Sequence, residues 1–219
     1  MFIEVNGIRL YYEKSGSGEP LIMVHCHRRS HKIFRKAIKL LEKHYTVYSI
    51  DSRSHGKSTR VQELHYDDMA EDVYQFITML GIEKPVFYGF SDGGIIGLIL
   101  ASKHPELLSK LIVSGASISP KSIKGFYMFF YKLCGFFDRS SKMQIIFREP
   151  NITDDMLRRI TAKTYITCGS RDLIRQSHTE HISELIPDSL LRIFQGENHS
   201  SYIINSRKIA DYIIETNSF

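Results

Sequence analysis

Short runs of apolar residues alternate along the chain with segments in which apolar positions recur every three or four residues. The first pattern is typical of buried strands, and the second is typical of helices that pack along one side. Strands are expected over residues 20–25, 46–51, 85–90, 110–114, 163–168 and 190–194, and helices over 33–45, 67–80, 93–103, 178–186 and 207–215. This alternation predicts parallel strands joined by helical crossovers.

The start of the chain follows a different pattern. Residues 2–5 and 8–13 flank Asn6-Gly7, a two-residue turn that fits the right-handed twist of an antiparallel hairpin. Continuous apolar runs such as residues 21–24 suit strands that are covered on both faces. The pattern therefore predicts an α/β fold with a doubly wound, mostly parallel sheet of about eight strands and an N-terminal hairpin.

Residues 117–161 interrupt the alternation with helix-like segments and no convincing strand. They lie between two expected strands, at the end of the sheet where the carboxyl ends of strands gather, and so predict a short helical lid within a single domain of residues 1–219. Within the lid, residues 125–137 are unusually aromatic. Three interpretations stay open: these rings line an apolar pocket, pack the lid onto the domain, or lie on a membrane surface.

Composition narrows the class of protein. The chain has 219 residues, of which 42% are hydrophobic and 24% are charged, as expected for a globular protein that buries a sizeable core. Its start lacks the basic and then apolar pattern of a secretory signal. The longest apolar-rich stretch, residues 125–137, is too short to span a bilayer. We therefore expect a cytoplasmic protein with no membrane span, and the oligomeric state stays open.

The charge does not indicate a nucleic-acid partner. The net charge is +5 and the pI is near 9.0, but the cations are scattered along the chain. The lysines and arginines of residues 32–43, for example, follow helical spacing opposite apolar positions, which is typical of a solvated helix face. No recognised nucleic-acid-binding motif accompanies them.

Cysteines and histidines give no convincing metal or disulfide pattern. The chain has three cysteines, at positions 26, 134 and 168, without the close pairing of a zinc ribbon or a disulfide framework. His25, Cys26, His27 and His31 lie close in sequence, but no carboxylate or cysteine pair completes a tetrahedral set. We therefore expect no metal, and we expect Cys26 to act as a small apolar side chain.

The most informative motif is Gly89-Phe90-Ser91-Asp92-Gly93, which matches G-x-S-x-G between an expected strand and an expected helix. A serine hydroxyl is a poor nucleophile until it is held clear of the backbone, next to a base and beside donors for an oxyanion. A sharp turn from strand to helix does this, and glycines flank the serine where side chains would crowd the bend.

An acid and a histidine follow in the order that such a serine requires. Asp172 comes just after the expected strand 163–168, and His199 comes just after the expected strand 190–194. Side chains at the carboxyl ends of parallel strands converge. His199 would take the proton from Ser91, and Asp172 would hold the imidazole ring and stabilise the imidazolium. Two simpler interpretations stay open, namely that Asp172 is a helix cap and that His199 is an exposed loop histidine.

With these features in this order, the sequence resembles the α/β-hydrolase fold family over essentially its whole length. The resemblance implies a serine hydrolase that cleaves a small ester or a related acyl or carbon–carbon bond through an acyl-enzyme. It implies no cofactor, and a small-molecule substrate that is apolar acyl or aromatic. Fold does not select the reaction, so two alternatives stay open. They are a non-catalytic small-molecule binding protein and a cofactor-free oxygenase or perhydrolase.

The resemblance also implies that the backbone N–H groups of Asp92 and His27 form the oxyanion hole. Members of the family usually carry glycines after the first histidine of this loop, whereas residues 26–30 here contain none. Ser54 also stands where the family usually has a glycine, but that departure concerns a structural turn more than the chemistry. We therefore expect a weakened oxyanion loop and low turnover. The further candidates for contact with substrate are Arg28, Arg29, Phe90, Tyr127 and Phe130.

Overall fold

The computed structural model describes residues 1–218 and contains one eight-stranded sheet with the order β1-β2-β4-β3-β5-β6-β7-β8. The strands are β1 (Phe2–Val5), β2 (Ile8–Ser15), β3 (Glu19–Val24), β4 (Tyr45–Asp51), β5 (Val86–Phe90), β6 (Lys110–Ser114), β7 (Lys163–Arg171) and β8 (Ser189–Asn198). The pairs β1·β2 and β2·β4 are antiparallel, and the other five pairs are parallel. The predicted α/β fold, with its opening hairpin and mostly parallel sheet, is confirmed.

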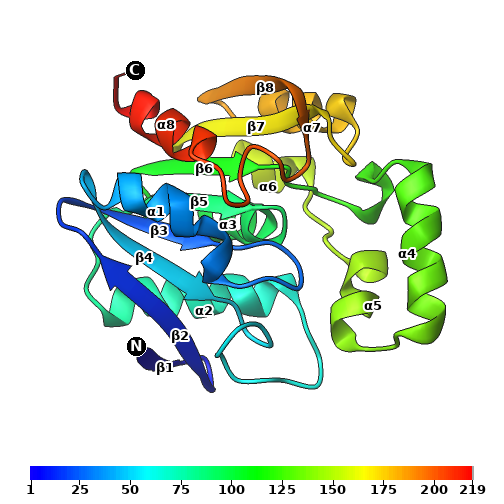
Figure 1. The fold of residues 1–219 in the computed structure, drawn as a ribbon, viewed down its shortest axis with the longest axis horizontal. Coiled ribbons are helices and arrows are strands. Elements are labelled where there is room, and N and C mark those ends of the chain that lie inside the picture. The colour runs from blue at the N-terminus through cyan, green and yellow to red at the C-terminus, as the bar shows by residue number, and fades with distance from the viewer. Residues whose placement is uncertain (219) are drawn as a thin grey trace.

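Helices cover both faces of the sheet (Figure 1). They are α1 (Arg35–Leu41), which follows the 3-10 turn η1 (His31–Phe34), α2 (Tyr66–Met79), α3 (Asp92–Lys103), α6 (Asp154–Arg158), α7 (Gln176–Leu185) and α8 (Lys208–Glu215), with a last turn η3 (Thr216–Ser218). One buried cluster joins α2, α3, α6 and α7 to the sheet, and the other joins α1 and α8 to its opposite face. The expected helix 33–45 is too long, because Tyr45 is already buried in β4.

The segment between β6 and β7 forms the 3-10 turn η2 (Pro120–Ser122) and the helices α4 (Gly125–Phe137) and α5 (Ser141–Arg148) before α6. In Figure 1, α4 and α5 lie beyond the carboxyl ends of the strands, apart from the helical layers. The segment is attached at both ends, since the Lys124 N–H donates to the Leu173 carbonyl (3.0 Å) and the Ile152 N–H donates to the Ile118 carbonyl (3.0 Å). Within residues 1–218, no helix is both long and apolar enough to cross a membrane.

Every residue of α4 is at least partly exposed, in contrast to the other long helices. Phe126, Phe129, Phe136 and Phe137 each expose more than three fifths of their surface. For these four rings, the interpretation that they pack onto the domain is therefore wrong. The sequence could not predict this exposure, because the apolar pattern of a helix is the same whether the helix packs on its own domain or on another molecule.

The topology places two loops at one point of the sheet. From β3 the chain crosses to β4 on one side, whereas β5 lies on the other side of β3. The loops that leave β3 and β5 therefore diverge and open a crevice at the carboxyl end of the sheet. Residues from His25 onward follow β3 and Ser91 follows β5, so the topology brings them together.

Candidate active site

Ser91 occupies a sharp turn between β5 and α3, with φ +54° and ψ −110°. This backbone region is unfavourable for any residue with a Cβ atom, so the surrounding structure must hold it in place. The turn is tight: a Cβ at Gly89 would lie 2.1 Å from the Gly93 carbonyl oxygen, and a Cβ at Gly93 would lie 2.1 Å from the Val24 carbonyl oxygen. The expected crowding on both sides of the serine is therefore present, and both positions require glycine.

Three side chains from distant parts of the chain meet at this turn. His199 Nε2 lies 3.1 Å from Ser91 Oγ, and His199 Nδ1 lies 2.7 Å from Asp172 Oδ1. Asp172 and His199 are the first residues after β7 and β8, respectively. Both strands run a few residues further than the sequence pattern predicts, but each candidate still lies directly at a strand end.

The acid of this group is buried and ionised. Burial raises the pKa of the Asp172 carboxyl, but the hydrogen bond and charge of His199 outweigh it, so that the pKa lies below its ordinary value. The Ile174 N–H also donates to Asp172 Oδ1 (2.9 Å). With an ionised acid beside it, His199 carries its proton on Nδ1 and presents a free Nε2 lone pair to the serine hydroxyl.

The N–H groups of His27 and Asp92 are available for an oxyanion. Within residues 1–218 neither group donates a hydrogen bond to another part of the chain. The two residues are also linked through their side chains, because His27 Nδ1 lies 3.1 Å from Asp92 Oδ2. Asp92 is the first residue of α3, where the N-terminal end of the helix favours negative charge.

The Asp92 side chain has a second partner, Tyr66 at the start of α2, whose hydroxyl donates to Asp92 Oδ1 (2.9 Å). Burial raises the pKa of Asp92, but the charge and hydrogen bond of His27 reverse the effect and lower the pKa overall. An ionised, buried carboxylate therefore lies directly behind the nucleophile turn.

The loop after β3 adopts the backbone that the missing glycines would have favoured. Arg28 has φ +55°, and Ser54, in the loop after β4, has φ +63°. The two loops are joined, since the Arg28 N–H donates to His55 Nε2 (3.1 Å). Arg28 therefore has a positive φ, the backbone conformation at which glycine is favoured. Burial raises the pKa of the Cys26 thiol to about 12, which fits the expected role of Cys26 as a small apolar side chain.

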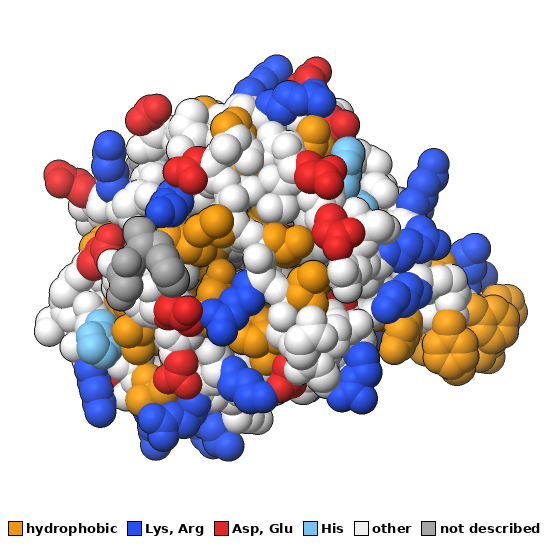
Figure 2. All heavy atoms as spheres, turned by 90° about the horizontal axis from the view of Figure 1, so that it is seen from above, with side chains coloured by type: hydrophobic (Ala, Val, Ile, Leu, Met, Phe, Trp, Pro, Cys, Tyr) orange, Lys and Arg blue, Asp and Glu red, His pale blue; other side chains and the backbone are white. Residues whose placement is uncertain are grey.

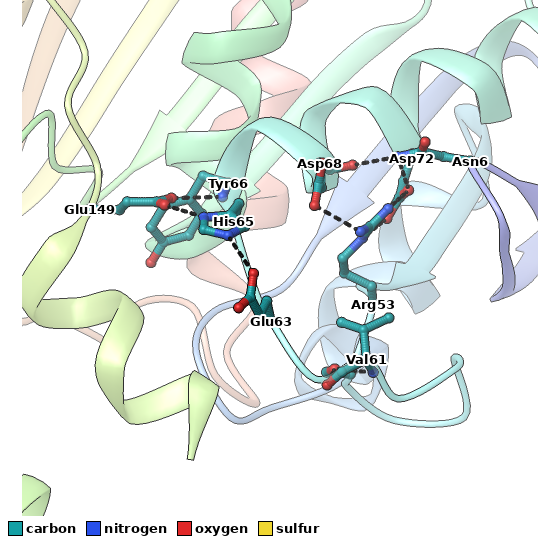
Figure 3. Close-up of polar contacts among 10 residues, drawn as sticks. Asn6, Arg53, Val61, Glu63, His65, Tyr66, Asp68, Asp72 and Glu149 are labelled. Atoms are coloured by element: carbon teal, nitrogen blue, oxygen red, sulfur yellow. Dashed lines mark hydrogen bonds and ion pairs between the residues drawn. The ribbon is translucent and has the colours of Figure 1, made fainter. Parts of the chain in front are cut away.

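Two separate groups of polar contacts hold the loop after β4 and the end of α5 against α2 (Figure 3). Arg53 makes paired contacts with the buried Asp72 of α2, including Nε to Oδ2 at 2.7 Å, and a third contact with Asp68. In the second group, Glu149 accepts from the Tyr66 N–H (2.9 Å) and contacts His65 Nδ1 (2.6 Å). Tyr66, at the start of α2, therefore contacts both Asp92 and the end of α5.

A narrow cavity with a volume of about 60 Å³ lies beside Ser91. Its walls are largely apolar, with polar groups gathered near the serine. The lining residues are His27, Tyr66, Ser91, Asp92, Ile95, Gly115, Ser117, Pro120, Ile123, Tyr131, Ile146, Glu149, Pro150, Leu173, Ile174 and His199. An apolar pocket with a few convergent polar groups is typical of a small-molecule site.

The structure does not bring the five further candidates for substrate contact to this cavity. Arg28 turns away to pair with Asp138 at the end of α4, and Arg29 lies on the outer surface beside Ser30 and Lys32. Phe90 is fully buried and supports the His199 ring, with ring centroids 5.1 Å apart. Tyr127 and Phe130 point to solvent from α4.

Most lining residues could not be predicted from the sequence, and three of them show why. Tyr131 lies in the aromatic segment, but nothing in the pattern distinguishes it from its neighbours as the ring that faces the cavity. Glu149 stands before a proline at the end of α5. Gly115 follows β6 directly, and a glycine at a strand end was the one available signal, because a Cβ there would lie 2.7 Å from His199 Cε1.

The cluster of histidines after β3 is engaged in internal contacts. His25 Nε2 accepts from the Ser52 N–H (3.1 Å), and His31 Nδ1 lies 2.7 Å from Asp51 Oδ1. Over the described part of the chain, His, Cys, Asp and Glu side chains form no group of three that could hold a metal ion.

A family model described as "alpha/beta hydrolase fold" matches residues 19–139, which is more than half of the chain. An ethanol acetyltransferase from Cyberlindnera jadinii is 31% identical over 109 residues, or 48% of this chain and 32% of its own. A 2-hydroxy-6-oxo-6-(2'-aminophenyl)hexa-2,4-dienoic acid hydrolase from Metapseudomonas resinovorans is 28% identical over 121 residues, or 53% of this chain and 42% of its own. The matched segments thus span less than half of the length of these relatives.

Among solved structures, an esterase from Exiguobacterium antarcticum superimposes with a TM-score of 0.82 and 26% identity. The match covers 100% of this chain and 99% of the esterase. The similarity in structure therefore extends over the sheet, the helical layers and the segment between β6 and β7.

Proposed function

The chain belongs to the α/β-hydrolase fold family, and from that premise we propose that it is a serine hydrolase that cleaves a small carboxylic ester. The observation that carries the proposal is the aligned contact of Ser91 Oγ with His199 Nε2 (3.1 Å) and of His199 Nδ1 with Asp172 Oδ1 (2.7 Å). A nucleophile, a base and an orienting acid in this arrangement are the groups that acyl transfer through a serine ester requires. The similarity to an esterase at 26% identity over the whole chain supports the choice of reaction.

In the first half of the reaction, Ser91 Oγ attacks the carbonyl carbon of the ester while its proton moves to His199 Nε2. The electron pair of the C=O bond moves to the carbonyl oxygen, and the N–H groups of His27 and Asp92 donate to that oxyanion. When the C=O bond re-forms, the bond to the alcohol oxygen breaks. His199 returns its proton to the departing alkoxide, which leaves an acyl group on Ser91.

In the second half, a water molecule attacks the acyl carbon and gives a proton to His199 Nε2. The new oxyanion occupies the same place, and its collapse breaks the bond to Ser91 Oγ, which takes the proton back from His199. Asp172 stays ionised throughout and stabilises the imidazolium in both halves. The residues of the chain therefore account for every proton in the cycle.

The narrow, mostly apolar cavity favours a short acyl group. A volume of about 60 Å³ next to Ser91 leaves little room for a long chain, and Ile95, Ile123 and Ile146 offer it no hydrogen-bonding groups. We expect kcat/KM for p-nitrophenyl esters to be highest for acetate to butyrate and to fall for octanoate. Arg28 and Arg29 lie away from the cavity, so anionic and neutral esters should be cleaved about equally.

A fluorophosphonate probe tests the nucleophile directly, because it reacts with an activated serine whatever the substrate. Wild-type protein should be labelled and Ser91→Ala should not. Ser117→Ala is a matched control: it lines the same cavity, but its hydroxyl bonds to the Ser119 carbonyl and the Ser122 hydroxyl instead of to a base. Equal labelling of wild type and Ser91→Ala, or no labelling of a folded sample, would contradict the proposal. The absence of labelling in a folded sample would favour a small-molecule binding protein that does not catalyse a reaction.

A second candidate function is acyl transfer to an alcohol, which the match to an ethanol acetyltransferase over 109 residues favours. Chemically, an alcohol would take the place of water in the second half of the reaction. The same assay distinguishes the two functions. If ethanol accelerates release of p-nitrophenol and ethyl ester accumulates at the expense of free acid, transfer dominates, whereas unchanged free acid supports hydrolysis.

A further inference from the structure

Helix α4 exposes an unusually large apolar surface. Phe126, Phe129, Phe136 and Phe137 are exposed to 69%, 65%, 72% and 81%, respectively, and the two other large side chains on the same surface are Phe130 and Leu133. We call these six side chains the aromatic face. Figure 2 shows hydrophobic side chains that protrude at one end of the molecule. An exposed apolar patch of this kind marks a surface that another body covers.

The rings of the aromatic face contact one another and do not pack on the rest of the domain. Phe126 and Phe130 have ring centroids 4.9 Å apart, and Phe136 and Phe137 have ring centroids 5.2 Å apart. Tyr131 points the other way and lines the cavity beside Ser91. The helix therefore has an inner side that closes the cavity and an outer side that meets the surroundings.

The charges around the aromatic face decide what can cover it. Residues 117–148 contain six cations and a single acid, Asp138, which is already paired with Arg28. The six cations are Lys121, Lys124, Lys132, Arg139, Lys142 and Arg148. The net charge of this segment, +5, equals that of the whole chain, so the rest of the chain is neutral overall and the excess positive charge lies in the segment that carries α4. Figure 2 accordingly shows lysine and arginine side chains next to the protruding apolar group.

From this combination we propose that α4 docks onto the surface of an anionic phospholipid bilayer. The phenylalanine rings of the aromatic face lie at the boundary between headgroups and acyl chains, and the surrounding lysines and arginines lie at the headgroup phosphates. A second copy of the chain fits this surface poorly. A symmetric contact through α4 would bring two segments of charge +5 against each other.

Docking would also affect how substrate reaches the cavity. This effect rests on the proposed function, whereas the docking itself does not. Because Tyr131 of α4 lines the cavity, a docked helix holds one wall of the cavity at the bilayer. Lipophilic esters concentrate in the bilayer and would meet the protein there. The docking itself requires no reaction, so Ser91→Ala should bind vesicles as wild type does.

The chain contains no tryptophan, which permits a clean fluorescence test. Phe137→Trp places a single reporter on the aromatic face, and Phe2→Trp places a matched reporter on β1, where 47% of Phe2 is exposed. Figure 1 shows β1 at the opposite end of the molecule from α4. Vesicles of phosphatidylcholine with phosphatidylglycerol at about 30% should shift the emission of Phe137→Trp to shorter wavelength and leave Phe2→Trp unchanged.

Vesicle sedimentation separates the apolar and the charged contributions. Phe136→Ser/Phe137→Ser should weaken binding to the anionic vesicles by at least about tenfold, because the inserted rings are lost. Lys132→Glu/Arg139→Glu, at two cations that the structure leaves without an ion pair within residues 1–218, should weaken it to a similar extent, as should high salt. Met79→Ser removes a side chain that is 61% exposed on α2 and should change nothing.

Three outcomes would overturn the proposal. They are no binding of wild type to anionic vesicles, equal binding of Phe136→Ser/Phe137→Ser and wild type, and equal binding of wild type to vesicles of phosphatidylcholine alone. Sedimentation velocity then tests whether a second copy of the chain binds the aromatic face. A dimer of wild type that becomes a monomer in Phe136→Ser/Phe137→Ser would show that it does. Vesicle binding by Ser91→Ala, together with absent ester hydrolysis by wild type, would contradict the proposed function and leave docking intact.

Discussion

The imidazole of His27 lies 3.1 Å from the carboxylate of Asp92, so the two residues whose N–H groups would hold the oxyanion are clamped together through their side chains. His27 follows β3 and Asp92 begins α3, and 65 positions separate them in sequence. Two N–H groups on different loops can point to one atom only when the loops keep a fixed distance. The side-chain contact supplies that constraint.

Removal of this contact should lower turnover more than substrate binding. We expect Asp92→Ala to reduce kcat about 10- to 100-fold on p-nitrophenyl acetate, with KM changed less than about threefold, because the oxyanion forms only in the transition state. Asp92→Asn keeps the shape and both contacts, with His27 and with Tyr66, and should retain most of the activity. Equal losses in the two variants would show that the charge of Asp92 matters and the clamp does not.

Gly115 should be essential for the position of His199. A Cβ at this glycine would lie 2.7 Å from His199 Cε1, so we expect Gly115→Ala to displace the ring from Ser91 and lower kcat by about a hundredfold. Gly81→Ala is the matched control, because its φ of +60° resembles the +57° of Gly115 while its Cβ would meet no atom within 4 Å. Both variants carry the same backbone strain, about 1 to 2 kcal/mol. Similar kcat values for the two would contradict a steric role.

Arg28 should limit activity through its backbone. Its φ of +55° costs about 1 kcal/mol relative to glycine, and some of that strain can be relieved by movement of the loop that holds the His27 N–H. We expect Arg28→Gly to raise kcat on simple esters by up to about fivefold with little change in KM. Arg29→Gly, next to it and without a positive φ, should have no such effect. An unchanged or lower kcat in Arg28→Gly would show that the loop already presents its donor well.

Stability should fall in mild acid because of His25. Burial, and to a lesser extent the nearby His55, lowers the pKa of His25 from 6.5 to about 4. As the pH falls, His25 is therefore protonated in the unfolded state before it is protonated in the folded state. Its contribution is present above pH 6.5 and is lost as the pH falls to about 4, by about 3 kcal/mol at most. Urea titrations should therefore give a free energy of unfolding that declines over this window.

His25→Gln should flatten this decline without abolishing it, because the pKa of His178 is also lowered to about 4, mainly by burial. The variant removes the titrating group and leaves the contacts with Cys26 and Ser52 only partly replaced, so its stability at pH 8 should be lower than that of wild type. A variant with the same slope as wild type between pH 7 and pH 4.5 would show that His25 is not the titrating group.

Much of the fold could be predicted because its signals are local. The strand at Lys110–Ser114 is a buried apolar run with clear boundaries, and Asn6-Gly7 selects one kind of hairpin. The positions of Ser91, Asp172 and His199 could also be predicted, since each follows a strand and parallel strands end at one edge.

Other features depend on contacts across the fold, and no local pattern contains them. His27 and Asp92 attract each other only because β3 and β5 are neighbours in the sheet. The exposure of α4 has the same origin, because an apolar helix carries no record of whether its partner is the sheet or something outside the chain. Arg28 looked like a substrate contact until the structure placed its side chain against Asp138.

The hydrogen bond between the Ile152 N–H and the Ile118 carbonyl means that the excursion carrying α4 and α5 leaves and re-enters the domain at a single point. An insert with joined ends behaves as an exchangeable cassette, because its length and sequence impose no strain on the strands that flank it. Changes in α4 or α5 can therefore be tolerated while the contacts that the start of the insert makes with residues 172–175 stay in place. The proposed chemistry at Ser91 and the surface that α4 presents can in this sense change independently of each other.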